Sequence, residues 1–239
     1  MPWYHAVAER DHDIQNPTSR EKIRMLGEWL RFGPGTKVLD IACGRCGPAL
    51  VLASTFGCRI TGVERAPEFV ATGRERIEQA GLADLIEVVE SDAREQQFEA
   101  EAWDVVLCLG ATFIWEDLDG TLAALVPAAG SGGHVVVGEP YWRRPIPNEV
   151  DDMGYVSLAE TVQRLEKAQL TTVGLIAASQ DDWDRYESLH WRAVEDWLEE
   201  HPEDPDAPDI RGEHEGHRRR YLETTRDLMG WAMFVGRRR

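Results

Sequence analysis

Short blocks of apolar residues recur along the chain, and they alternate with longer stretches in which apolar residues return every three or four positions. The short blocks have the length and β-branched content of buried strands, and the longer stretches have the period of amphipathic helices. This alternation predicts an α/β fold with a parallel, doubly wound sheet. We expect strands at 37–42, 59–64, 85–91, 103–110, 133–140, 171–179 and 230–238. We expect helices at 18–33, 48–56, 66–82, 117–128, 157–170, 181–201 and 213–228.

Three segments are extra to this minimal sheet. Residues 1–20 are polar and predicted to be irregular, and residues 141–157 are rich in Pro and Trp. Residues 181–226 add two helices joined by a Pro/Asp-rich linker at 202–209, which we expect to be mobile. Because specificity commonly lies in such additions, we expect the N-terminal segment and the late helices to form a lid over a site.

The stretch VLDIACGRCGPAL, residues 38–50, runs from a predicted strand through two glycines into a helix. Gly44 and Gly47 allow close approach of a ligand, and the helix N-terminus offers free N–H groups. Glu64 ends the next strand, where a carboxylate meets the ribose hydroxyls of a nucleotide. Asp40 would repel a pyrophosphate but suits a ligand with an amino group. The pattern therefore predicts a nucleotide-type cofactor.

The ordered motifs DIACGRCG, GVERA, ESDAR and CLGATF resemble those of class I S-adenosylmethionine-dependent methyltransferases. The resemblance extends to the turn LVPAAGSGGHVVVGEP, and it implies a Rossmann-like, mostly parallel seven-stranded sheet. It also implies S-adenosylmethionine as cofactor, with S-adenosylhomocysteine as product. Asp40 is expected to face the methionine amino group, Glu64 the ribose, Arg65 the adenine ring and Asp92 the adenine amino group. The full set of expected cofactor contacts is Asp40, Ala42, Cys43, Gly44, Gly47, Glu64, Arg65, Asp92, Ala93, Leu109 and Gly110.

Under this resemblance the chain, 1–239, is one methyltransferase domain whose residues 21–140 form the cofactor-binding core. Residues 1–20 supply the lid, and residues 141–157 and 181–226 lie on the substrate side. The substrate-side candidates are Tyr4, Asn16, Phe113, Tyr141, Trp142, Trp183 and Tyr186. The aromatic side chains among them either wall a pocket or cover the sheet, and the pattern leaves both interpretations open.

Two residues are candidates for catalysis in an in-line methyl transfer. Glu139 ends the fifth strand, where it could orient the acceptor or take its proton; its structural alternative is a bond to Tyr141 or Arg143. His12 titrates near neutrality when unperturbed and could serve as a base; its structural alternative is an exposed loop residue.

The Cys43–Cys46 pair, spaced as Cys-x-x-Cys, raises the question of a metal or redox site. A zinc site needs two further ligands, and Cys58 and Cys108 fall on other predicted elements. We therefore interpret both cysteines as part of the cofactor loop and expect no metal. A thiophilic substrate such as arsenite, bound by Cys43 or Cys46, is an alternative.

Composition narrows the classes of partner. The chain has 239 residues, a formal net charge of −17 and 43% hydrophobic residues. A surface this acidic repels nucleic acid and anionic membranes, so the acceptor is expected to be a small molecule. No signal peptide or membrane span is predicted, and a cytoplasmic location is expected. A nicotinamide-dependent oxidoreductase and a non-catalytic S-adenosylmethionine-binding protein are the alternatives; the latter would have an apolar-filled space over residues 109–113.

Overall fold

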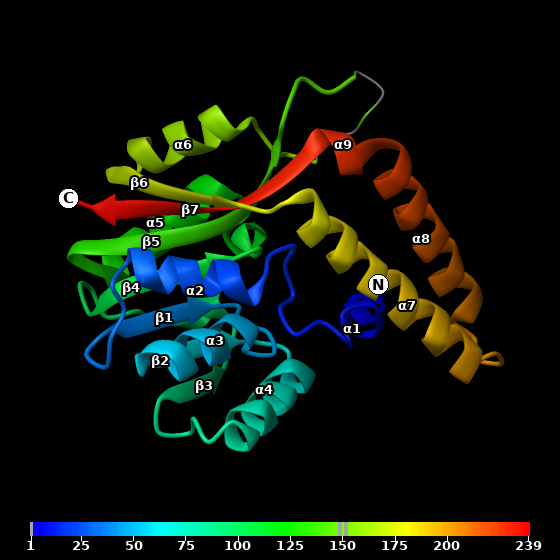
Figure 1. Cartoon of the computed structure of the whole chain (residues 1–239), viewed down its shortest axis with the longest axis horizontal. Helices are drawn as coiled ribbons and strands as arrows, with labels where there is room; N and C mark the ends of the chain where they lie inside the picture. The colour runs from blue at the N-terminus through cyan, green and yellow to red at the C-terminus, as the bar shows by residue number, and fades with distance from the viewer. Residues whose placement is uncertain (1, 148–149, 151–152) are drawn as a thin grey trace.

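A computed structural model describes residues 2–147, 150 and 153–239 of the chain. Its centre is one seven-stranded sheet with the order β3-β2-β1-β4-β5-β7-β6 (Figure 1). The strands that pair from β3 to β5 run parallel, and β7 lies antiparallel between β5 and β6. The strands are β1 (Lys37–Ile41), β2 (Arg59–Glu64), β3 (Ile86–Glu90), β4 (Trp103–Leu109), β5 (Ala129–Trp142), β6 (Leu170–Ala177) and β7 (Met229–Arg238). The expected Rossmann-like, seven-stranded sheet is thus confirmed.

Helices begin where the sequence offers a cap. Ser19 caps α2 through a bond from the Lys22 N–H, and Ser157 and Ser179 form capping boxes that start α6 and α7. The α-helices are α1 (Pro2–Ala8), α2 (Arg20–Trp29), α3 (Gly47–Phe56), α4 (Pro67–Gln79), α5 (Leu118–Leu125), α6 (Leu158–Lys167), α7 (Gln180–Glu200), α8 (Ala207–Arg220) and α9 (Arg226–Leu228). The shorter turns are η1 (Ala93–Glu95), η2 (Thr112–Trp115), η3 (Val126–Ala128) and the π-turn η4 (Tyr221–Thr225).

The strand side chains alternate between two apolar cores, one on each face of the sheet. Val38, Val105 and Leu107 pack with α2, α3 and α4. Leu39 and Val106, which alternate with them, pack with α5 and α6 on the other face. Because both faces are covered, the strands read as continuous apolar runs, and this is why the sequence predicted them well.

The helices α1, α7 and α8 form an additional layer beyond one end of the strands, as Figure 1 shows. A small core of Ala8, Val194, Leu198, Ala207 and Ile210 holds the three helices together. Two expectations are wrong here. Residues 1–20 are not wholly irregular, since residues 2–8 are helical, and the predicted linker at 202–209 ends early because α8 already begins at Ala207.

Among the described residues, no helix has both the length and the apolar character needed to cross a membrane.

Candidate functional site

The turn after β1 has an unusual backbone. Ala42, Gly44 and Cys46 all have positive φ angles, of 53°, 55° and 62°, so the chain reverses tightly before α3 begins at Gly47. Two of the three are not glycine, and a left-handed conformation at Ala and Cys is strained. Such strain concentrates at ligand sites, and the turn places the N-terminus of α3 at the carboxyl edge of the sheet.

Two carboxylates meet at this turn from neighbouring strands. Glu64 binds the turn itself: its Oε2 accepts from the Gly44 N–H at 3.0 Å, and its Oε1 accepts from the N–H groups of Arg65 and Ala66, each at 2.9 Å. Asp40 is only 2% exposed, and its Oδ2 has no hydrogen-bond partner among the described residues. Burial, reinforced by the charge of Glu64, raises the pKa of Asp40 to about 7.

An orphaned buried carboxylate beside a second one calls for a cationic or hydrogen-donating partner. The ammonium group of an amino acid supplies both properties. The two carboxylates at the turn therefore fit a ligand that carries an amino group.

The cysteines of the turn are part of the core. Their Sγ atoms lie 3.9 Å apart, and both thiols are free and buried. The Cys43 sulfur packs over Gly62 and the Cys46 sulfur over Gly73, where a Cβ would come within 2.7 and 2.8 Å of them. The contact with Cys46, together with burial, holds the pKa of the Cys43 thiol well above its usual value. Both enclosed thiols have the surroundings of inert structural cysteines.

The N-terminal segment, residues 9–16, lies directly on the turn. The Arg45 N–H donates to Gln15 Oε1 at 2.8 Å, and the Arg45 guanidinium donates to the Glu9 carbonyl at 2.7 Å. A Cβ at Gly44 would lie 2.2 Å from Gln15 Oε1, and one at Gly47 would lie 2.1 Å from the Asp13 carbonyl oxygen. Both glycines thus leave room for this segment. Gln15 and Arg45 were missed by sequence reasoning, which assigned the glycines to the cofactor alone.

The segment also reaches β4. The Asn16 amide donates to the Leu109 carbonyl at 3.1 Å, and a Cβ at Gly110 would lie 2.2 Å from Asn16 Oδ1. Leu109 and Gly110, two expected cofactor contacts, are therefore partly covered by a residue expected on the substrate side.

The expected adenine side is built on β3. Asp92 caps η1 through the Arg94 N–H at 2.9 Å, and its carboxylate accepts from the Arg94 guanidinium at 2.6 Å. These bonds lower the pKa of Asp92 to about 2, with a smaller effect from the charge of Arg65. Ala93 is buried beneath, and Arg65 is exposed. The carboxylate is therefore ionised at neutral pH and remains able to accept a further bond.

Glu139 ends the parallel part of β5 and is 8% exposed. Its Oε2 accepts a short bond of 2.6 Å from the Thr112 hydroxyl, not from Tyr141 or Arg143. Burial raises the pKa of Glu139 to about 7, although the Thr112 bond opposes this rise. Burial raises the pKa of the Cys108 thiol, and the charges of Asp40 and Glu139 raise it further. Thr112 was missed by sequence reasoning, although it lies in the open CLGATF motif after β4.

His12 is buried, so the alternative of an exposed loop residue is wrong. Its Nε2 lies 3.0 Å from the Tyr186 carbonyl oxygen, and its ring lies 4.8 Å from the Tyr186 ring. Burial lowers the pKa of His12, which keeps the imidazole neutral at neutral pH. His12, Asn16 and Tyr186 line a cavity of about 170 Å³ between the N-terminal segment and α7.

The remaining substrate-side candidates divide by location. Tyr141 packs edge-on against Phe234 and covers Gly230, and Trp142 lies in the core on the other face, so both cover the sheet. Trp183 stacks on Tyr221 with ring centroids 6.3 Å apart.

Two candidates lie elsewhere. Tyr4 packs on the core between α7 and α8. Phe113, in η2, is 68% exposed.

The chain is similar in sequence and structure to known proteins. Residues 38–133 match the family model described as a methyltransferase domain. The protein YjhP of Escherichia coli is 31% identical over 243 residues, covering 98% of each chain. A crystal structure of an S-adenosylmethionine-dependent methyltransferase from Geobacter sulfurreducens in complex with S-adenosylhomocysteine is 32% identical, with a TM-score of 0.93 over 100% of this chain and 99% of the other. A second such complex, from Thiobacillus denitrificans, is 31% identical, with a TM-score of 0.91 over 98% and 97% of the two chains.

A strained turn, a buried carboxylate oxygen with no hydrogen-bond partner among the described residues, and full-length similarity to cofactor complexes lead to one conclusion. The chain belongs to the S-adenosylmethionine-dependent methyltransferases, and S-adenosylmethionine is its cofactor.

Proposed function

We propose that this methyltransferase acts on a small-molecule acceptor, and that Glu139 orients the acceptor or takes its proton. The observation that carries the proposal is the buried Glu139 carboxylate at the edge of the sheet, held by Thr112 and with its pKa raised to about 7. A base with a pKa near the working pH combines a useful ionised fraction with the basicity to accept a proton. Burial removes competing water from such a group.

The cofactor supplies a methyl group bound to a positively charged sulfur. This sulfur is the leaving group, and it needs no protonation to leave. The residues of the chain then have two tasks, which are to align the acceptor and to hold its proton. We assign Asp40 to the amino group of the cofactor, Glu64 to its ribose, and Asp92 with Arg65 to its adenine. The glycine turn from Ala42 to Gly44 would hold the carboxylate end.

The proposed acceptor class rests on charge and on a cavity. The net charge of −17 disfavours approach of a polyanion, and a partly open cavity of about 170 Å³ lies between the N-terminal segment and α7. Curated relatives that match only part of the chain include a sterol 4-C-methyltransferase of Caenorhabditis elegans and a tocopherol O-methyltransferase of Arabidopsis thaliana. They also include a 23S rRNA methyltransferase of Klebsiella pneumoniae, so RNA is the competing acceptor class.

A fractionation assay tests the acceptor class. The protein would be incubated with S-adenosylmethionine labelled in the methyl group and with a cell extract, which is then separated into nucleic acid, protein and low-molecular-mass fractions. We expect the label in the low-molecular-mass fraction, and less of it with the control variant Asp40→Asn, whose affinity for the cofactor is expected to be lower. Label that enters RNA or protein and is reduced in the control would contradict the proposal.

A further inference from the structure

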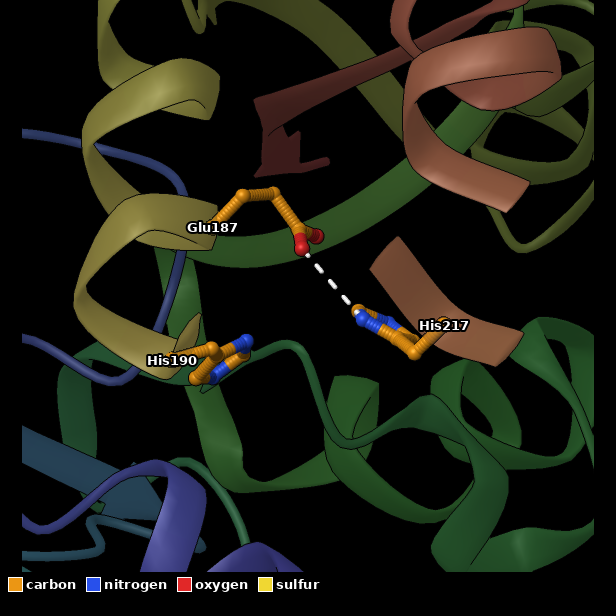
Figure 2. A group of neighbouring side chains, drawn as sticks. All are labelled: Glu187, His190 and His217. Carbon is orange, nitrogen blue, oxygen red and sulfur yellow. Dashed lines mark ion pairs between the residues drawn. The ribbon is translucent and has the colours of Figure 1, made fainter. Parts of the chain in front are cut away.

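A group of three metal-ligating side chains lies in the outer helical layer, away from the glycine turn. Glu187 and His190 project from α7 one helical turn apart, and His217 projects toward them from α8 (Figure 2). One ligand atom from each residue lies within 4.8 Å of those of the other two. The Glu187 Oε2 and the His217 Nδ1 are 3.3 Å apart. Two helices thus direct three ligand atoms into one small space.

These ligand atoms make no hydrogen bond among the described residues, although Glu187 Oε2 and His217 Nδ1 face each other as an ion pair at 3.3 Å (Figure 2). Glu187 is 4% exposed and His190 is 7% exposed. Glu187 Oε2, His190 Nε2 and His217 Nδ1 are all buried, and none meets hydrogen-bond geometry with another group in the described part of the chain. An unsatisfied buried polar atom costs about 1–3 kcal/mol, so three together are unfavourable unless something binds them.

The surroundings of the group do not satisfy it. The His190 ring lies edge-on to the Tyr186 ring at a centroid distance of 4.4 Å, and it is tilted against the His12 ring at 4.5 Å. Burial raises the pKa of the Glu187 carboxyl to about 8. The Trp191 indole lies near this carboxyl and opposes the rise. The neutral imidazole is the form that binds metals, through either ring nitrogen.

The donor set identifies the class of ion. Two imidazoles and one carboxylate are the ligands of zinc sites with an open fourth position and of some iron sites, whereas Mg²⁺ and Ca²⁺ prefer oxygen ligands alone. In a tetrahedral site with bonds of about 2.0–2.2 Å, neighbouring ligand atoms are about 3.4 Å apart. Glu187 and His217 already have this separation, and the ligand atoms of the remaining pairs lie within 4.8 Å of one another.

We propose that Glu187, His190 and His217 bind one divalent transition-metal ion, such as Zn²⁺, that joins α7 to α8 and keeps one coordination position open. This differs from the sequence expectation of no metal. The ion would fix the helix that contacts His12, and the segment containing His12 continues onto the glycine turn. His217 is partly exposed and gives the ion a route of entry.

Calorimetry with metal-free protein and Zn²⁺ alone tests the proposal. We expect the native protein to bind one equivalent, and Glu187→Gln and His217→Ala each to weaken binding at least tenfold. His201→Ala removes an exposed histidine at the end of the same helix and serves as the matched control, with unchanged affinity. Zn²⁺ should raise the Tm of the native protein and the control, and leave that of the two ligand variants unchanged.

Two results would overturn the proposal. One is the absence of stoichiometric binding by the native protein, and the other is native affinity in both ligand variants. If a variant does not fold, the native protein with Co²⁺ decides the question. Intense visible absorption of a four-coordinate ion supports the site, and a spectrum like that of aqueous Co²⁺ rejects it.

Discussion

Replacement of the buried Asp40 is expected to change protein stability and cofactor binding in opposite directions. Without a ligand its carboxylate has no partner for Oδ2, and its pKa moves from 3.8 to about 7. The change Asp40→Asn removes the charge and keeps the shape of the side chain. We therefore expect the variant to be more stable than the native protein at pH 8, and to bind S-adenosylhomocysteine at least tenfold more weakly.

The magnitude follows from proton linkage. Because the folded state holds the proton more tightly than the unfolded state, the native protein loses stability as pH rises from 3.8 through 7. A pKa change of this size corresponds to about 4 kcal/mol above pH 7, at about 1.4 kcal/mol for each unit. Relaxation around a buried charge reduces the effect, so the expected gain at pH 8 is about 2–4 kcal/mol. Below pH 3.8 both states are protonated, and the difference disappears.

Urea unfolding at pH 8 and pH 5 without cofactor, followed by calorimetry with S-adenosylhomocysteine, measures both effects. Ligand at one hundred times its Kd should stabilise the native protein by about 2.7 kcal/mol and the variant much less. Asp84→Asn, at an exposed position before β3, is the control and should change neither quantity. The reasoning is refuted if the Asp40 variant is less stable at pH 8, or if its affinity for the ligand is native.

Two other perturbations test the contacts around the site. Gly47→Ala places a methyl group against the Asp13 carbonyl and should destabilise the protein by about 1–3 kcal/mol. Gly47→Ala should also speed hydrogen exchange in residues 9–16, and unchanged exchange would mean that the segment does not depend on this contact. The control Gly212→Ala, in open space on α8, should leave the stability unchanged or raise it by up to about 1 kcal/mol. Thr112→Val removes the bond that lowers the pKa of Glu139, so the rise of kcat with pH should move to higher pH; an unshifted pH profile would separate Thr112 from the reacting group.

Sequence reasoning succeeded where the signal was local. The strands are buried on both faces and appear as apolar runs, and Ser19 marks the start of α2 by its own hydrogen bond. It failed for residues 2–8, because a seven-residue helix that begins with proline is stabilised by packing on α7 rather than by its own sequence.

The residues of the site also divide into those with a local sequence signal and those without one. Asp40 and Glu64 could be singled out as candidates because each lies at the carboxyl end of a strand of the parallel sheet. The contact between Gly47 and Asp13 joins segments 34 residues apart and has no local signal. The proposed metal ligands Glu187 and His190 lie three residues apart on one helix, but His217 comes from another helix, so the sequence alone did not bring the three together.

The central claim is that Glu139 acts on the acceptor, and the turnover of Glu139→Gln tests it most directly. The measurement is kcat with the acceptor fraction found by fractionation, together with the Kd for S-adenosylhomocysteine from calorimetry. We expect a loss of at least tenfold in kcat, equivalent to about 1.4 kcal/mol in the barrier, with the Kd little changed. Full turnover in a folded Glu139→Gln variant would contradict it, and would leave alignment of the acceptor by other residues as the sole contribution of the chain.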